Sequence, residues 1–371
     1  MSLPADTFLW KIGKKWLSPL INKFYHLEFS GEIPKPPFLL ICNHVSPIDP
    51  FLIAPYIDVP ISWVIAQISF QNPIERFFLK KIGAIQKFKS RPDPTMLYSI
   101  FDILNKGGVV GLFPEGTITW TGDFQDHLVS LKSMNKLIFS LNVPIVATRI
   151  QGAWLSHPVW ADHGRKPKIF VNFKTFSDYS AMDFIHHSEW EWQKKHLIPY
   201  PGKRKAQGIE RVLWICPHCL SFRTLSSERE DVVCSFCLNR WTIDDYGFIG
   251  GRTLPDLFNQ QIEVFSKKIN GLPKVSFPPA KISLRNDRTT GLIKTLRQRL
   301  ILQNDTLHID NIPMNISKIK GINTHFRDIL EFRYEDNLVR IKSKYTSFLL
   351  YNWIVMRKKI LHELSTEETG A

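Results

Sequence analysis

The sequence has no long run of apolar residues, no recognisable secretory signal and few cysteines. Its best candidate for a membrane span, residues 51–70, is interrupted by two prolines, an aspartate and a glutamine, whereas a transmembrane helix needs about 18 or more apolar residues in succession. Residues 1–6 lack the charged start, apolar centre and small-residue cleavage site of a signal peptide. We therefore expect a protein of the cytosol or of the cytosolic face of a membrane.

Only five cysteines occur in the 371 residues, and four of them form two Cys-x-x-Cys pairs. These four are Cys216, Cys219, Cys234 and Cys237. Thiolates at such spacing predict a zinc ribbon in a reducing compartment rather than a set of disulfides. Four thiolates around tetrahedral Zn²⁺ leave no open position for a substrate, so the expected zinc is structural.

Acidic residues are outnumbered, 34 against 48 lysines and arginines, which gives a net charge of +14. This excess indicates an anionic partner: a phospholipid surface, nucleic acid or a phosphorylated substrate. The length suggests two or three domains, and the apolar content of 44% is ample for their cores. No internal repeat or low-complexity segment is present.

A short apolar run over residues 38–42 predicts a buried strand that ends in a polar turn. His44 stands in this turn, and Asp49 follows where Ser46-Pro47 or Asp49-Pro50 can begin a helix. The Asp49 carboxylate can therefore fold back to the His44 imidazole, fix its tautomer and stabilise the imidazolium. The pair predicts a general base with its orienting acid, acting on a substrate that brings its own hydroxyl.

The same residues also have a purely structural interpretation. Asp49 before Pro50 is a good helix N-cap, Ser46-x-x-Asp49 is a good capping box, and His44 is then only a loop residue. A second stretch favours the catalytic interpretation. Residues 107–117 predict another apolar strand that ends in a tight turn, Phe113-Pro114-Glu115-Gly116-Thr117. Taken alone, this turn could have a purely structural role.

Asn-His-x4-Asp followed by Phe-Pro-Glu-Gly-Thr resembles the glycerolipid (lysophospholipid) acyltransferase family, over about residues 30–180. The resemblance implies an α/β fold with a mostly parallel sheet flanked by helices, as the alternation of strands and helices also indicates. It implies transfer of a fatty acyl group from coenzyme A or acyl carrier protein to a hydroxyl of a lysophospholipid such as 1-acylglycerol-3-phosphate. His44 and Asp49 would be catalytic. Substrate would be bound by Asn43, Phe113, Pro114, Glu115, Gly116 and Thr117, with Glu115 and Gly116 recognising the acceptor.

Residues 83–91 occupy the place of the family's Gly-x-Ile-Phe-Ile-x-Arg block, which resembles a phosphate-binding element. Lys89 stands at the arginine position, with Lys87 and Arg91 beside it. These three cations are expected to hold the acceptor phosphate and so place its hydroxyl near His44. The chain departs from the family at Ile118, where an arginine is usual, so its acceptor need not be lysophosphatidic acid.

Linker and turn signals divide the chain into four expected segments. They are a helical membrane-contact segment (1–28), the acyltransferase domain (29–200), the zinc ribbon (208–250) and a β-rich domain (275–368). A stretch marked by glycine and proline, residues 250–279, separates the last two. The β-rich domain has short strands and a closing helix over residues 347–364, an order reminiscent of a pleckstrin-homology-like barrel.

Residues 6–25 combine a lysine-bearing stripe with a wide apolar face that includes Trp10 and Trp16. Tryptophan and lysine together suit an interfacial membrane anchor, and an ordinary amphipathic helix that covers the core is the alternative. Ser18-Pro19 is expected to begin a second short helix, which would give a bent helical pair.

Two other functions compete with acyl transfer. A basic zinc-ribbon protein that binds nucleic acid would explain residues 212–250 and the charge, but it leaves both motif turns unexplained. A lipid-binding scaffold with an inactive acyltransferase domain is the other alternative. The expected partners are a membrane phospholipid surface, a lysophospholipid acceptor and, as one of two donors, acyl carrier protein; nucleic acid is the less favoured partner.

Overall fold

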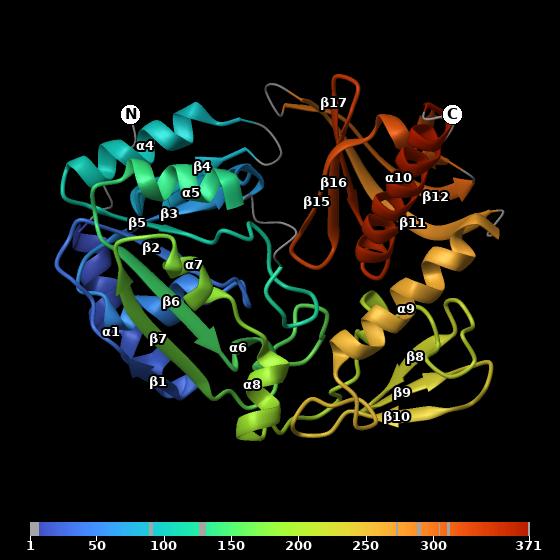
Figure 1. Cartoon of the computed structure of the whole chain (residues 1–371), viewed down its shortest axis with the longest axis horizontal. Helices are drawn as coiled ribbons and strands as arrows, with labels where there is room; N and C mark the ends of the chain where they lie inside the picture. Colours follow the sequence, from blue (N-terminus) through green and yellow to red (C-terminus); the bar gives the residue numbers. More distant parts are fainter. Residues whose placement is uncertain are drawn as a thin grey trace. The chain divides into compact units, whose positions relative to one another are not determined.

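The computed structural model describes residues 7–88, 92–125, 131–271, 274–287, 291–303, 305–309 and 312–369. The chain forms two compact units (Figure 1). The first comprises residues 1–159, 163–203 and 245–247, and the second comprises 160–162, 204–244 and 248–371. The expected β-rich segment therefore falls in the second unit, as does the expected zinc ribbon apart from residues 245–247. The division into four segments stays a prediction.

The first unit is built on a seven-stranded sheet of order β1-β7-β6-β2-β5-β3-β4. Its strands are β1 (Leu27–Ser30), β2 (Phe38–Cys42), β3 (Ile61–Ala66), β4 (Ile85–Lys87), β5 (Val109–Leu112), β6 (Ile145–Gln151) and β7 (Ile169–Phe176). All neighbours run parallel except β6 and β7. Every residue of the central strand β2 is buried, as expected of a strand covered on both faces. The predicted mostly parallel sheet is confirmed.

Helices cover both faces of this sheet. They are α1 (Thr7–Tyr25), α2 (Asp49–Ile53), α3 (Pro73–Lys81), α4 (Pro94–Asn105), α5 (Leu131–Ser140), α6 (Ala153–Ser156), α7 (Ser180–Ile185) and α8 (Glu189–His196). Buried side chains of α4, α5 and α7 form one core cluster with β2, β5 and β6. The chain crosses from β2 to β3 in one direction and from β5 to β6 in the other, so right-handed connections place α2 and α5 on opposite faces.

The N-terminal segment forms one helix, α1, with Pro19 inside it. The expected bent pair with a break at Ser18-Pro19 is therefore wrong. Lys14 Nζ donates to the carbonyl oxygen of Ile57 at 2.8 Å and pairs with Asp58, which ties the turn before Pro19 to the rest of the unit. Such tertiary contacts offset the loss of one backbone donor. Among the described helices, none has both the length and the apolar character to cross a bilayer.

The second unit begins with a small antiparallel sheet of order β10-β9-β8, whose strands are β8 (Leu225–Glu228), β9 (Asp231–Cys234) and β10 (Arg240–Thr242). Helix α9 (Leu254–Lys268) follows, within the stretch marked by glycine and proline. Thr253 and Asp256 form a reciprocal capping box at its start, and its second residue is Pro255, which a first helical turn tolerates.

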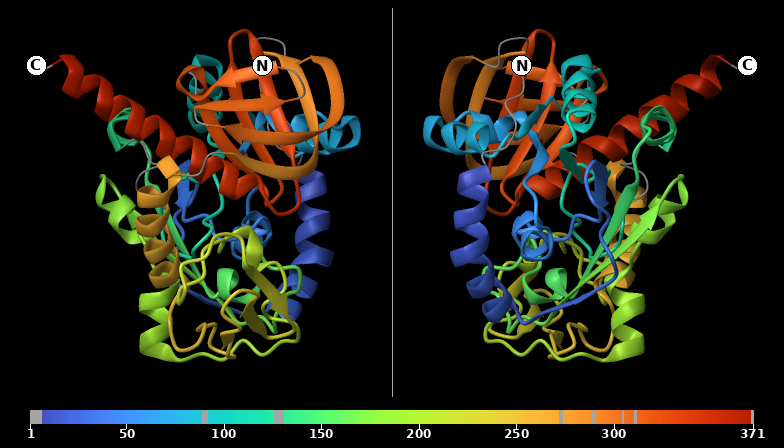
Figure 2. Two further views of the ribbon diagram at one scale, coloured as in Figure 1. Left: turned by 90° about the vertical axis from the view of Figure 1, so that its right-hand side faces the viewer. Right: turned by 90° about the vertical axis from the view of Figure 1, so that its left-hand side faces the viewer.

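A second seven-stranded sheet, entirely antiparallel, has the order β14-β13-β12-β11-β17-β16-β15. Its strands are β11 (Val275–Asn286), β12 (Leu292–Gln303), β13 (Thr306–Ile309), β14 (Ile312–Asn315), β15 (Lys320–His325), β16 (Ile329–Tyr334) and β17 (Asn337–Lys342). Figure 2 shows the curvature of this sheet and the long closing helix α10 (Ser347–Thr369). The β-rich fold is confirmed, and the pleckstrin-homology likeness stays a prediction.

Candidate active site

The turn after β2 brings His44 and Asp49 into contact. His44 Nδ1 lies 2.8 Å from Asp49 Oδ2. The same carboxylate oxygen accepts hydrogen bonds from the backbone N–H groups of Val45 and Ser46, at 2.9 and 3.0 Å. Asp49 is the first residue of α2, and its side chain reaches back over the turn rather than capping the helix. The structural and catalytic interpretations thus meet in one carboxylate, which holds the loop and orients the imidazole.

Asp49 is fully buried, whereas the His44 side chain is partly exposed. Burial raises the pKa of Asp49, and the contact with His44 and the two backbone hydrogen bonds only partly oppose this effect. A buried carboxylate is costly without polar partners, and the contact with His44 and the N–H groups of Val45 and Ser46 supplies them. Because Nδ1 faces Asp49, Nε2 is the nitrogen that can take a proton from a substrate.

Glu115 ties the second motif to the first. Its Oε1 accepts a hydrogen bond from the backbone N–H of His44 at 2.7 Å, and its Oε2 accepts one from the N–H of Gln125 at 3.0 Å. The residue is 4% exposed. The backbone N–H of Thr119 also donates to the carbonyl oxygen of His44 at 3.0 Å. The segment after β5 therefore binds both the backbone N–H and the carbonyl oxygen of His44, and Glu115 acts here as a brace.

An aromatic stack supports the imidazole. Phe113 lies face to face with His44, with 4.2 Å between ring centroids, and Trp63 of β3 stacks on Phe113 at 5.1 Å. The motif placed Phe113 near the site, but nothing in the sequence indicated Trp63. Trp63 lies in an ordinary apolar strand, and only the pairing of β3 with β5 brings it beneath Phe113.

Asn43 joins β2 to the end of β6. Its side-chain amide donates to the carbonyl oxygen of Ile150 at 2.9 Å, and its Oδ1 accepts from the N–H of Ile150 at 2.8 Å. Asn43 is 2% exposed, so in this structure it fixes backbone. The neighbouring Cys42 is fully buried, and burial raises the pKa of its thiol well above the usual value. A protonated, enclosed thiol is a poor nucleophile.

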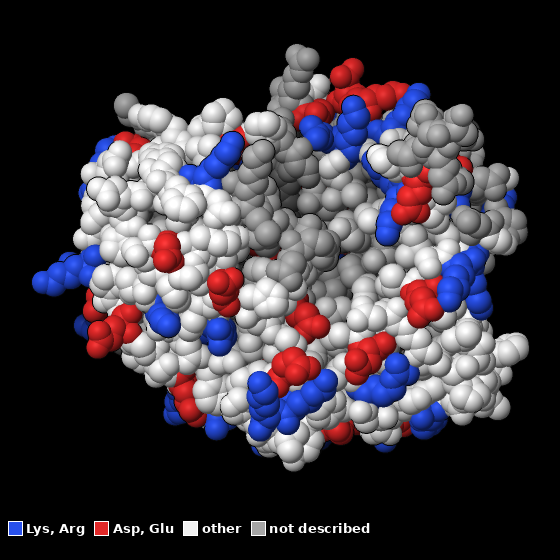
Figure 3. All heavy atoms as spheres, in the orientation of Figure 1, with Lys and Arg blue, Asp and Glu red and all other residues white. Residues whose placement is uncertain are grey.

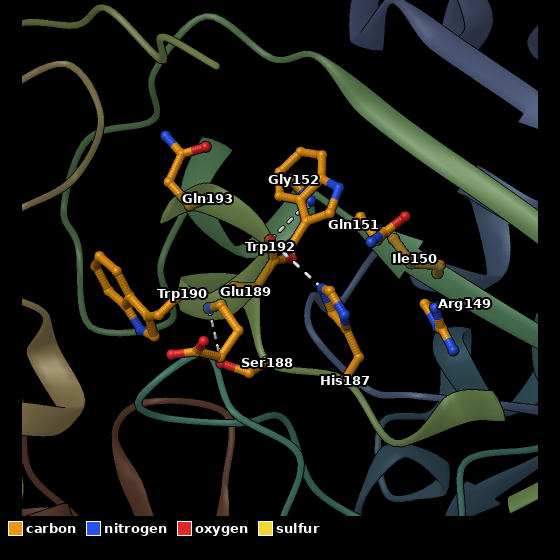
Figure 4. Close-up of polar contacts among 12 residues, drawn as sticks. Arg149, Ile150, Gln151, Gly152, His187, Ser188, Glu189, Trp190, Trp192 and Gln193 are labelled. Atoms are coloured by element: carbon orange, nitrogen blue, oxygen red, sulfur yellow. Dashed lines mark hydrogen bonds and ion pairs between the residues drawn. The ribbon is translucent and has the colours of Figure 1, made fainter. Parts of the chain in front are cut away.

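Figure 4 shows a second clamp on the same strand end, at Gly152. Both carboxylate oxygens of Glu189, the first residue of α8, lie 2.9 Å from the N–H of Gly152, and His187 Nε2 lies 4.0 Å from Glu189. Gly152 has φ +80°, and a Cβ there would lie 2.2 Å from the Tyr200 hydroxyl. Glycine is therefore required, and β6 is held at two points beside His44.

Residues 26–151 match the family model described as Acyltransferase. This segment is an acyltransferase domain. The match contains both motif turns.

Among solved structures, the chain is similar to the 1-acyl-sn-glycerophosphate (LPA) acyltransferase PlsC from Thermotoga maritima. The identity is 16% and the TM-score is 0.39, with 50% of this chain and 82% of the other covered. No curated protein sequence matches the chain.

The remaining predicted substrate-binding residues of the acyltransferase domain lie around the same turn. Gly116 is exposed at φ +65°, its N–H donates to the carbonyl oxygen of Phe113 at 3.0 Å, and Pro114 and Thr117 flank it half-buried. Ile118, which stands where the family has arginine, is buried. An apolar side chain suits that enclosed position, and it removes a cation from the site.

Lys87 ends the edge strand β4 and is half-buried. Lys89 and Arg91 lie outside the described residues. Because β4 pairs in parallel with β3, Lys87 is at the same edge of the sheet as the carboxyl end of β3. The three roles in phosphate binding stay predictions.

An open apolar pocket adjoins the aromatic stack at Trp63. It lies between α1 and the elements that follow β2; its lining residues include Trp10, Leu17, Ile21, Phe51, Ile61 and Trp63. Trp63 thus has one neighbour in the stack beneath His44 and also forms part of the pocket wall.

The four paired cysteines of the second unit converge, with their sulfur atoms all within 4.8 Å of one another. Two of the sulfur pairs, Cys216 with Cys237 and Cys219 with Cys234, are 3.7 Å apart. Zn–S bonds of about 2.3 Å in a tetrahedron require sulfur atoms about 3.8 Å apart. All four are free thiols, so the residues fit a zinc ion.

Proposed function

We propose that the protein is an O-acyltransferase that moves a fatty acyl group from a thioester, of coenzyme A or acyl carrier protein, to a hydroxyl of a lysophospholipid such as 1-acylglycerol-3-phosphate. The observation that carries this proposal is the contact between His44 Nδ1 and the buried Asp49. It leaves Nε2 to take the acceptor's proton as the hydroxyl oxygen attacks the thioester carbonyl. When the C–S bond breaks, the imidazolium returns the proton to the thiolate, and the products are an ester and a thiol.

The apolar pocket supports a substrate with a long hydrocarbon chain. Its lining from α1, α2 and β3 is mostly apolar, and it reaches Trp63 at the base of the aromatic stack. We infer that an acyl chain lies in this pocket while the reacting carbonyl or hydroxyl is held at His44. Holding both reactants in this way lowers the entropic part of the barrier.

Helix α1 supports a peripheral position on the cytosolic face of a membrane. Large apolar side chains recur every fourth residue on its exposed side; they are Phe8, Ile12, Trp16, Leu20 and Phe24. Helix α3 adds exposed Ile74, Phe77 and Phe78. Exposed apolar stripes bordered by lysines are typical of helices that lie in a bilayer interface. An acceptor lipid could then enter the pocket from the surface that α1 contacts.

The test of the function is turnover of a radiolabelled acyl thioester with a panel of lysolipids. We expect ester formation by the wild type and a loss of roughly a hundredfold to ten-thousandfold in His44→Ala, with an unchanged circular dichroism spectrum. Folded wild type without turnover on any acceptor would favour the scaffold. Tight oligonucleotide binding without turnover would favour the nucleic-acid protein.

The phosphate clamp has its own test. Replacing Lys87, Lys89 and Arg91 with glutamine is expected to raise the KM for the acceptor far more than the KM for the thioester. Unchanged values of both constants would mean that these cations form only a solvated surface.

A further inference from the structure

The solvent-facing side of the β11–β17 sheet carries cations directly opposite one another. Lys281 of β11 pairs in register with Lys342 of β17 and with Arg297 of β12, and we call these three residues the basic row. All three are exposed, while the alternate residues Ile282 and Ile341 are buried, so the row lies on the side away from the core. Residues directly opposite on a sheet have Cβ atoms about 5 Å apart.

Within the described part of the chain, none of the three side chains of the basic row has an ion pair or hydrogen bond. The same holds for Arg299, exposed two residues beyond Arg297 on the same side of β12. Like charges directly opposite on a sheet are destabilising. Anions bound between these cations would turn this destabilising repulsion into a stabilising attraction.

Two exposed aromatic residues lie at the same end of the sheet as Lys342. Phe326, 55% exposed, occupies the turn between β15 and β16, and Tyr345, 44% exposed, follows β17. The register of β16 with β17 pairs Ile329 with Lys342, which places the Phe326 turn beside the row. Phe326 also has φ +53°, a conformation that a bulky residue rarely adopts.

Net charge alone does not identify this surface. On the face drawn in Figure 3, lysines and arginines are interspersed with acidic residues over most of the area. The strand register instead singles out the basic row, because there the cations are neighbours without an acidic residue between them.

We propose that the basic row, Arg299 and the flanking Phe326 and Tyr345 form a docking surface for an anionic phospholipid bilayer. Lysine and arginine attract lipid phosphates, each contributing near the membrane, and exposed aromatic rings settle at the headgroup level. The choice of lipid over nucleic acid rests on the proposed function, since the acceptor of that reaction is itself a membrane lipid. The β-rich sheet then makes a second membrane contact, independent of α1.

The test compares two full-length variants with the same change in charge. One replaces the basic row (K281Q/R297Q/K342Q), and the control replaces three exposed lysines elsewhere in the second unit (K274Q/K294Q/K318Q). Binding to phosphatidylcholine vesicles with and without phosphatidylglycerol is measured by cosedimentation. We expect the first variant to lose roughly tenfold to a hundredfold in affinity for the anionic vesicles only, and the control to lose much less.

A substitution at the strained turn separates docking from folding. Phe326→Gly removes the ring and relieves the positive φ, so thermal stability should stay the same or rise while vesicle affinity falls severalfold. Equal vesicle binding by the basic-row variant and its control would overturn the proposal. The proposal would also be overturned if the wild type bound a labelled oligonucleotide more tightly than anionic vesicles and the basic-row variant lost that oligonucleotide binding.

Vesicle binding and acyl transfer are measured separately in this design. Turnover on a short-chain soluble acceptor should be equal in both charge variants. Absence of turnover in the wild type would refute the proposed reaction, and the binding comparison would still decide the docking surface.

Discussion

The two units use their buried polar groups differently. In the acyltransferase domain, Asp49, Glu115 and Asn43 bind backbone N–H groups of turns at strand ends. In the second unit, Glu331 is held by other side chains, with His325 Nε2 at 3.1 Å and a close pair with Arg340, and four thiols face one another. The first arrangement positions backbone for chemistry, whereas the second neutralises charge and holds a fold together. Substitution of these residues in the acyltransferase domain should therefore lower turnover. Substitution of Glu331 or the cysteines in the second unit should mainly lower stability.

The largest expected effect is on the zinc ribbon. Binding of Zn²⁺ to such a module contributes on the order of 10 kcal/mol, so chelation should unfold about forty residues around the four cysteines. Metal analysis should give about one Zn per chain. Acyl transfer to a soluble acceptor is expected to continue, because none of the proposed catalytic residues is one of the four cysteines. If turnover were lost in proportion to the zinc removed, catalysis would depend on the second unit and the two units would not have separate roles.

Asp49→Asn is expected to lower kcat on the order of a thousandfold. The amide oxygen can still accept from Val45 and Ser46, but it cannot stabilise the imidazolium of His44. Turnover and thermal unfolding are measured on the same preparation. If the Asp49→Asn variant turned over as fast as the wild type, Asp49 would have a purely structural role.

Substitution of Glu115 distinguishes a role in positioning His44 from a role in recognising the acceptor. In Glu115→Ala the buried N–H groups of His44 and Gln125 lose their acceptor, at a cost of about 4 kcal/mol of stability in total. We expect kcat to fall while the acceptor KM changes little, and Glu115→Gln to recover part of the rate through its one remaining oxygen. A rise confined to the acceptor KM would show that Glu115 contacts the substrate instead.

The smallest expected effect is the acid sensitivity of the β-rich sheet. Burial by itself would raise the pKa of Glu331, but the hydrogen bond from His325 and the charges of His325 and Arg340 outweigh it and lower the pKa to about 2. The carboxylate therefore contributes stability above its unfolded pKa of 4.5, and this contribution is lost as the pH falls from 4.5 towards 2. It should amount to about 3 kcal/mol.

Urea unfolding of wild type and Glu331→Gln between neutral pH and pH 3 checks this expectation. The variant should be less stable at neutral pH and should lose less on acidification. Identical slopes of stability against pH would mean that another group is responsible.

The contact between His44 and Asp49 could be predicted because the two residues are local in sequence. His44 and Asp49 follow one strand, and Glu115 follows another, so short patterns carry both turns. Parallel strands end at the same edge, which brings the turns together. Trp63 and Glu189 could not be predicted, since their roles depend on which strands and helices are neighbours and not on any pattern around them.

Three prolines or proline pairs lie inside regular elements or at their start. Pro19 lies inside α1, where contacts of Lys14 hold the helix. Pro255 starts α9 rather than preventing it. Pro278 and Pro279 lie within β11, at a register shift between Phe277 and Ala280 where ladder hydrogen bonds are not required. In each case the proline occupies a position where the missing backbone donor is tolerated, which its place in the sequence alone does not reveal.

The exchange of short segments between the units bears on how the chain folds during synthesis. Residues 245–247 belong to the first unit, where the N–H of Tyr200 donates to the carbonyl oxygen of Asp245 at 2.6 Å. Residues 160–162 belong to the second, where Arg211 binds Trp160 and Asp162. A nascent acyltransferase domain can pair its strands once β7 has emerged, but its last contacts form only after the ribbon has been made. A chain cut near Tyr200 should therefore fold more slowly and less completely than the intact protein.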